Sequence, residues 1–242
     1  MFFLIAKYVV EVIIISIFYK YFCFSVKEVS ASFLKVVFSI GIPTAIMNLL
    51  ISVNYSIDVL MLNVMGSSDV QIGIYGLAYS LSNMLWIVPD AFKEAVYNKS
   101  VKSDDYRFIF KCFVINIAIC AAILVCFIFL GKFFLDIVYG EEYVVSYETI
   151  LVLFAGVIPM IAFKLIHPIY VNSGKSLLVA ILLIIAVVAN VVASIFLIPS
   201  HGALGAAIAT VISYTICGIM FLFKFCYDFF WKKRNNDVET IK

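Results

Sequence analysis

Seven apolar stretches, each of about 20 residues or more, follow one another along the chain and limit what it can fold into. A stretch of this length crosses a bilayer as an α-helix. In lipid, only helices and closed barrels satisfy every backbone hydrogen bond, and these stretches lack the alternation of polar and apolar residues that barrel strands show. The pattern predicts an all-α, polytopic membrane helical bundle with about seven transmembrane helices. We expect these helices over residues 2–24, 33–64, 72–95, 109–130, 149–171, 177–198 and 203–225.

The composition excludes a water-soluble globular protein. Hydrophobic residues make up 65% of the 242 residues and charged residues 13%, against about 45–50% and about 25% in soluble domains. The links between spans are short and carry no Gly-rich phosphate loop, no H-E-x-x-H helix and no G-x-S-x-G turn. The six cysteines form no C-x-x-C pair and are expected to be packing residues. We therefore expect no catalytic residues, cofactor, metal or disulfide, and a protein that is not an enzyme.

The stretch over 33–64 is longer than the hydrocarbon thickness of a membrane requires. It also contains Pro43, and a proline inside a helix removes a backbone hydrogen bond. We expect this helix to tilt, to bend near Pro43, or to protrude beyond the membrane.

Basic residues are concentrated on one side of the predicted topology. Cytoplasmic loops carry an excess of Lys and Arg. Fourteen of the seventeen basic residues fall in the links after the first, third and fifth spans, in the C-terminal segment, or at the span ends that flank them, which places the C-terminus in the cytoplasm. The net charge of +2 reflects this topology and gives no reason to expect nucleic acid as a partner. Met1 leads directly into an apolar run without the basic start of a signal peptide, which fits a chain cut from a longer one.

Polar residues inside predicted spans are functional candidates because they are costly in lipid. Glu11 lies near the middle of the first span with Lys7 one turn before it, so the two either neutralise each other or line a cavity. Asp58 comes late in the second span, where it closes a cavity, binds a cation or takes an interfacial position. Asn190 lies deep in the sixth span, and an interhelical hydrogen bond is a common use of Asn there.

Lys164 and His167 form the most prominent basic pair within the predicted bundle. They are three residues apart on the fifth span and therefore share a helix face, between Pro159 and Pro168. Lys164 is a candidate for facing an anionic substrate, although its long side chain can also reach the cytoplasmic surface. His167 is the weaker candidate for the same role.

Three groups of motifs occur in an order that resembles a known family. Within residues 41–96, a Pro early in one span and an Asp near its end precede a GSSD turn, a G-x-Y-x-x-A motif and a Pro that ends the next span. IVYGEEY at 137–143 and NSGKS at 172–176 follow, the latter leading on to LIPSHGALGAAIATVIS. Over nearly the whole chain, this order resembles the polysaccharide flippases of the multidrug, oligosaccharidyl-lipid and polysaccharide exporter superfamily.

The resemblance implies a division of the chain into three parts. Residues 1–31 are similar to the last helix and cytoplasmic link of a first half, and residues 32–231 to the six-helix C-terminal half of a MATE-like transporter. Residues 232–242 then form a cytoplasmic tail. Repeat-built transporters enclose their site between two halves, so the resemblance implies that the missing half, or a second copy of this chain, acts as a partner in the membrane.

The resemblance also implies a function. Members of this family move an undecaprenyl-diphosphate-linked oligosaccharide across the bacterial inner membrane by alternating access, for O-antigen, lipopolysaccharide or capsule biosynthesis. In this chain Lys164 and His167 match the cationic residues that attract the diphosphate, and Glu11, Asp58 and Asn190 are the residues available for a cavity or for coupling. A multidrug or cation exporter of the same superfamily, a membrane polysaccharide polymerase and a nonfunctional fragment are the alternatives.

Overall fold

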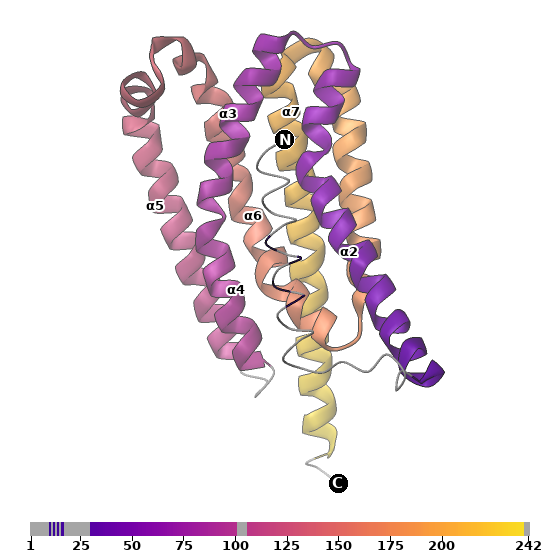
Figure 1. Cartoon of the computed structure of the whole chain (residues 1–242). Coiled ribbons are helices and arrows are strands. Elements are labelled where there is room, and N and C mark those ends of the chain that lie inside the picture. The colour runs from indigo at the N-terminus through magenta and orange to yellow at the C-terminus, as the bar shows by residue number, and fades with distance from the viewer. Residues whose placement is uncertain are drawn as a thin grey trace. The chain divides into compact units, whose positions relative to one another are not determined.

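The computed structural model describes residues 10, 12, 14, 16, 30–100 and 106–239 of the chain. In this part of the chain the backbone is helical apart from short links, and no strand occurs. The predicted all-α class is therefore confirmed for the described residues (Figure 1). The elements are α2 (Ala31–Val64), α3 (Asp69–Leu85), α4 (Ile87–Ser100), α5 (Tyr106–Tyr139), the 3₁₀ helix η2 (Glu141–Ser146), α6 (Tyr147–Asn172) and α7 (Ser176–Glu239).

The chain divides into two compact units, Met1–Ile42 and Pro43–Lys242, with the boundary inside α2. In the first unit the structure describes the beginning of α2, where the large apolar side chains of Leu34 and Phe38 are exposed. The helix predicted over residues 2–24 lies outside the described residues apart from four isolated positions. The remaining observations concern the second unit.

Several described helices are long and apolar enough to cross a membrane, which confirms this part of the prediction. There are four such helices among the described residues, or up to five if a bent pair within α2 is one span. The count of seven and the orientation in the membrane stay predictions. The four helices are Asp69–Lys99, Arg107–Tyr139, Glu141–Asn172 and Ser176–Phe229, and the bent pair is Val37–Val53 with Ser56–Val64.

Helix α7 is a hairpin of two helical limbs. The backbone leaves the helical region at Gly202, where φ is 52° and ψ is −127°, and Pro199 precedes this break. The Ser213 hydroxyl donates a hydrogen bond of 2.7 Å to the backbone carbonyl of Ala186. Residues on either side of the break are therefore paired, and the first limb (176–201) and the second limb (203–239) run antiparallel. Both are longer than the roughly 20 residues that one crossing needs.

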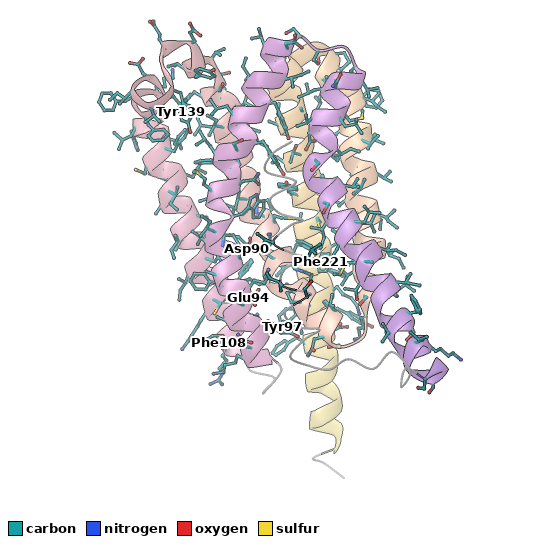
Figure 2. The ribbon with its side chains drawn as sticks, in the orientation of Figure 1. Asp90, Glu94, Tyr97, Phe108, Tyr139 and Phe221 are labelled. Atoms are coloured by element: carbon teal, nitrogen blue, oxygen red, sulfur yellow. The ribbon has the colours of Figure 1, made fainter. Side chains whose placement is uncertain are left out.

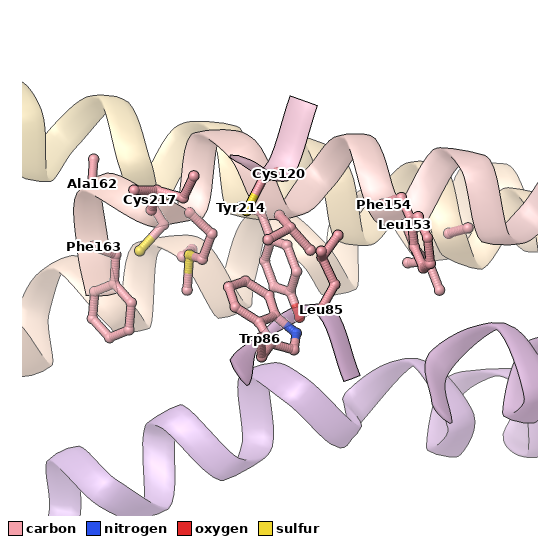
Figure 3. Packing of buried hydrophobic residues seen from close by; sticks show 14 of the residues in the cluster. Leu85, Trp86, Cys120, Leu153, Phe154, Ala162, Phe163, Tyr214 and Cys217 are labelled. Atoms are coloured by element: carbon pink, nitrogen blue, oxygen red, sulfur yellow. The ribbon is translucent and has the colours of Figure 1, made fainter. Parts of the chain in front are cut away.

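Helix α6 lies at the centre of the packing and α5 at its edge. In the most apolar stretch of each helix, 67% of α6 is buried, against 11% of α5. Along this core the Trp86 ring contacts Tyr214 edge to face, with ring centroids 5.7 Å apart (Figure 3). The large apolar side chains that α5 leaves exposed suit contact with lipid, because a membrane helix need not hide them from its solvent.

Small residues allow the limbs of α7 to pack closely. A Cβ atom on Gly218 would collide with the Pro159 carbonyl of α6, and one on Gly205 would collide with the Leu197 carbonyl of the first limb. Close backbone approach at Gly and Ala is how membrane helices gain packing energy, since lipid removes the hydrophobic drive between them. The small-residue run that begins at Gly202 thus has a structural role in the hairpin.

The expected bend of α2 lies away from Pro43. The helix continues through that proline, and it bends by 55° between Val53 and Ser56. The segment beyond the bend carries Asp58 and Leu62, which are both fully buried. Met47, before the bend, is also buried, so the bend lies between two segments that both pack into the core.

Helices α3 and α4 meet at Trp86 and together form one of the candidate spans. Pro89 lies in the first turn of α4, where its missing N–H costs no helical hydrogen bond. The Asp90 N–H donates to the Trp86 carbonyl at 3.0 Å, which joins the two helices closely. This junction turns the Trp86 ring and the Asp90 carboxylate toward α6.

Candidate functional site

Asp58 is the most deeply buried ionisable side chain that the sequence singled out. Its exposed fraction is zero, and among the described residues neither carboxyl oxygen has a hydrogen-bond partner. Among the described residues, Asp58 takes part in no salt bridge. Burying a charged carboxylate without partners costs roughly several kcal/mol of free energy relative to leaving it in water. Such a group is stable when it carries a proton or binds a cation.

Three side chains from two other helices face the Asp58 carboxyl. They are Tyr75 of α3, Asn190 of the first limb of α7 and Thr210 of the second limb. Each is close enough to act on the charge of Asp58, but none meets the distance and angle of a hydrogen bond to it. Asp58 and Asn190, which the sequence singled out separately, thus belong to one site.

The hydroxyl hydrogens around Asp58 are committed to other acceptors. Thr210 donates to the Ala206 carbonyl at 2.9 Å, so in the 3.2 Å contact between Tyr75 and Thr210 the tyrosine is the donor. Ser194 donates to Asn190 Oδ1 at 3.0 Å. Asn190 Nδ2 is the buried side-chain donor of this group that lacks a partner. The hydroxyl groups therefore offer oxygen lone pairs to the space beside Asp58.

This arrangement suits a hard monovalent cation or a proton. Oxygen atoms are the ligands that hard cations prefer, and one carboxylate balances one positive charge. A divalent ion would leave an uncompensated charge in an apolar core. No group of three or more His, Cys, Asp or Glu side chains that would hold a transition metal occurs among the described residues.

Helical spacing and the α7 hairpin build the site. Asn190 and Ser194 are one turn apart on the first limb, and Ala206 and Thr210 are one turn apart on the second. The break at Gly202 brings these two pairs together. Tyr75 reaches them from α3, where it is fully buried although its ring carries a hydroxyl.

A second cluster surrounds Lys164. Its ammonium lies 2.8 Å from Asp90 Oδ1 and 5.0 Å from the centroid of the Trp86 ring. Lys93 lies 3.7 Å from the same carboxylate oxygen and 3.4 Å from Glu94. Figure 2 labels Asp90 and Glu94, which both lie on α4. The Lys164 side chain is 13% exposed and that of Asp90 is 42% exposed. The positive charge of Lys164, which the sequence singled out, is therefore neutralised by the Asp90 carboxylate of α4.

His167 is held mainly by its own helix. Its Nδ1 lies 2.9 Å from the Phe163 carbonyl, and its ring stacks on the Phe163 ring with centroids 4.4 Å apart. These contacts fix the ring on the side of α6 that also carries Lys164. Glu11 lies outside the described residues.

Sequence reasoning missed Asp90 and Thr210, and it included Tyr75 only as the tyrosine of the G-x-Y-x-x-A motif, without a role in a site. Asp90 is the first-turn acid of α4 and has the ordinary pattern of a helix start. Tyr75 lies among many aromatic residues, and Thr210 lies in a run that reads as small-residue packing. A single polar residue in an otherwise apolar or small-residue stretch was the available signal for both.

Comparison with protein families, curated proteins and solved structures gives no match for this chain. The candidate site therefore stands on its own geometry.

Proposed function

We propose that this chain is the membrane part of a transporter driven by a monovalent cation, either sodium or a proton, that binds at Asp58. The supporting observation is the fully buried Asp58 carboxyl, which has no hydrogen-bond partner among the described residues and faces Tyr75 of α3, Asn190 of the first limb of α7 and Thr210 of the second limb. Because the Asp58 carboxyl of α2 faces α3 and α7, binding of a cation there changes how these three helices pack. Loading and unloading then favour different helix arrangements, as alternating access requires.

The proposed cargo is a lipid-linked oligosaccharide with an undecaprenyl-diphosphate anchor. This step rests on the motif resemblance and on the cluster at Lys164. Asp90 serves as the counter-ion of Lys164 and Lys93. A diphosphate carries the same charge type with more oxygen atoms, so it can replace the Asp90 carboxylate beside both lysines. The proposed location is a bacterial inner membrane, with O-antigen or capsule assembly as the process.

A drug or cation exporter of the same superfamily is the second candidate function. The Asp58 site favours it equally, since such an exporter is also driven by a cation. The Lys164 cluster distinguishes the two candidates, because a cationic drug has no use for paired lysines, whereas a diphosphate does.

Glycan display in a host that lacks its own flippase tests the proposal. We expect display when this chain is expressed with a complementary half, and loss of display with Asp58→Asn, which keeps the shape of the side chain and removes its charge. Asp136→Asn is the matched control, because Asp136 lies exposed on α5. Immunoblots of membranes establish equal amounts of each variant. Full display with Asp58→Asn would contradict the role of Asp58, and no display with any form of the chain would contradict the cargo.

A further inference from the structure

A pocket of about 460 Å³ opens at the end of the bundle where α2 joins α3. One wall is the α2–α3 link with Ser67, and the opposite wall is the turn of α7 from Ile198 to Gly202. Gln71, in the first turns of α3, lies between these walls. Figure 1 shows the α2–α3 link and the α7 turn at the same end of the bundle.

The pocket and the Asp58 site lie along one seam between helices. On α3, Tyr75 of the site follows Gln71 of the pocket by one turn. On the first limb of α7, Ile198 is one turn from Ser194, and on the second limb Gly202 is one turn from Ala206. Side chains spaced by four residues lie on one face of a helix. Each helix therefore carries a row of residues from the pocket down to the site.

The depth of the site below the pocket is small. Asp58 lies about 9 Å before the end of α2 at Val64, at 1.5 Å per residue. Thr210 lies about 12 Å beyond Gly202 on the second limb. A cation that enters the pocket thus has two turns of helix to pass before it reaches the carboxyl.

Gln71 spans the seam at the pocket. Its Oε1 accepts a hydrogen bond of 2.8 Å from the Ala203 N–H, the first donor of the second limb. Its amide also lies against Gly202, where an added Cβ would meet Oε1 at 2.5 Å. The Gln71 side chain therefore crosses from α3 to the turn of α7, one helical turn before Tyr75. One hydrogen bond holds it there, beside a residue that has no side chain.

We propose that this pocket is the aqueous entrance through which sodium reaches Asp58, and that Gln71 is the gate. The inference rests on the proposed function, because it assigns a route to the cation of that site. Gln71 is a positioning residue in this scheme. It contributes no ligand to the cation, and its movement controls the rate at which the cation arrives and leaves.

A thiol placed between pocket and site measures whether Gln71 closes the route. Ser194→Cys is a nearly isosteric change at a fully buried position of the seam. The purified full chain is treated with a small water-soluble methanethiosulfonate, and labelling is quantified by peptide mass spectrometry. We expect Gln71→Ala to speed labelling at position 194 about fivefold or more, the effect of losing one hydrogen bond that holds the closed form.

Two controls separate gating from general loosening. Native Cys217 is fully buried on the second limb and reports unfolding in the same sample. Asn83→Ala removes an exposed amide from the same helix, α3, and should change nothing. Equal labelling at position 194 with and without Gln71→Ala would overturn the gate, and so would faster labelling at 194 and Cys217 together.

Binding of ²²Na⁺ to the purified full chain, followed by scintillation proximity, tests the cation route. We expect Gln71→Ala to speed association and dissociation by the same factor and to leave the dissociation constant unchanged. Asp58-dependent binding with unaltered rates would overturn the entrance and leave the site standing. Sodium binding that Asp58→Asn does not reduce, or no sodium binding at all, would overturn the sodium site and with it this route.

Discussion

The ammonium of Lys164 lies 2.8 Å from Oδ1 of Asp90, across the interface between α6 and α4. The same ammonium lies over the Trp86 ring, so its charge has both an anionic and an aromatic partner. The pair unites two helices that are far apart in sequence at the point where α3 passes into α4. It ties the proposed cargo site to the geometry of that junction.

Removing one member of this pair should cost more than removing both. Asp90→Asn leaves the largely buried Lys164 charge without its anion, and we expect unfolding to become easier by about 1–2 kcal/mol, a modest value because Asp90 is partly exposed. Lys164→Met in the same chain should restore part of the loss. Thermal unfolding in detergent of the two single variants and the double variant measures the coupling, and purely additive effects would contradict it.

Binding of farnesyl diphosphate should respond to the same residues in opposite directions. We expect Asp90→Asn to tighten binding about fivefold by removing the competing carboxylate, and Lys164→Met to weaken it by a similar factor. Microscale thermophoresis with the purified chain gives both values. Lys175→Met is the matched control, since Lys175 is exposed on the link after α6. Tighter binding to Lys164→Met would exclude a diphosphate at this cluster.

Sodium should stabilise the protein through Asp58. A ligand that binds only the folded state raises the melting temperature with concentration. We expect the wild-type melting temperature to rise when sodium chloride replaces choline chloride at constant ionic strength. Asp58→Asn should melt higher than wild type without sodium, because an amide is neutral without having to bind a proton or a cation, and should not respond to the salt. An equal sodium response in both proteins would refute binding at this carboxyl.

The two glycines at the α6–α7 interface should differ in their tolerance of alanine. Gly218→Ala places a methyl group against the Pro159 carbonyl, and Gly156→Ala places one 2.8 Å from the Val211 side chain. A side chain can turn away and a backbone carbonyl cannot. We expect losses of about 3 kcal/mol and about 1 kcal/mol respectively. Gly73→Ala, with open space around it, serves as control in the same unfolding assay.

Alanine at Gly66 and alanine at Gly202 together distinguish the effect of backbone strain from the effect of displacing Gln71. Both have positive φ, at 71° and 52°, so alanine costs about 1 kcal/mol or more at either position, and more at Gly202, where ψ is −127°. At Gly66 the added methyl meets nothing, whereas at Gly202 it displaces Gln71. We therefore expect Gly202→Ala to be less stable than Gly66→Ala and to label faster in the Ser194→Cys assay. Identical labelling of the two variants would indicate strain alone.

Much of the helical layout was readable from the sequence because lipid imposes length and apolarity on each helix separately. The described helices from α2 to α7 cover the stretches expected from residue 33 onward. A bend near Pro43 was one of three expectations for this helix, and the structure has a bend between Val53 and Ser56, where the sequence contains no proline. Burial of Asp58 and Leu62 beyond Val53 is a tertiary effect.

The candidate site was readable only as separate residues. Asp58, Asn190 and Lys164 attracted attention because polar groups are rare and costly within apolar spans. Asp90 and Gln71 attracted none. Asp90 resembles an ordinary helix start, and Gln71 resembles a surface residue. The distances that join Lys164 to Asp90 and Gln71 to Ala203 depend on how α3, α4, α6 and α7 pack, which no single stretch of sequence specifies.

The α7 hairpin places the completion of the Asp58 site late in synthesis. Asn190 and Thr210 follow Asp58 by roughly 130 to 150 residues, which a ribosome adds in on the order of 10 s. During that interval the carboxyl has none of its α7 neighbours, and the protonated form is the one that lipid tolerates best. The last helices to be made therefore complete the site, and a nascent chain that stops before Asn190 contains the acid without the groups that surround it.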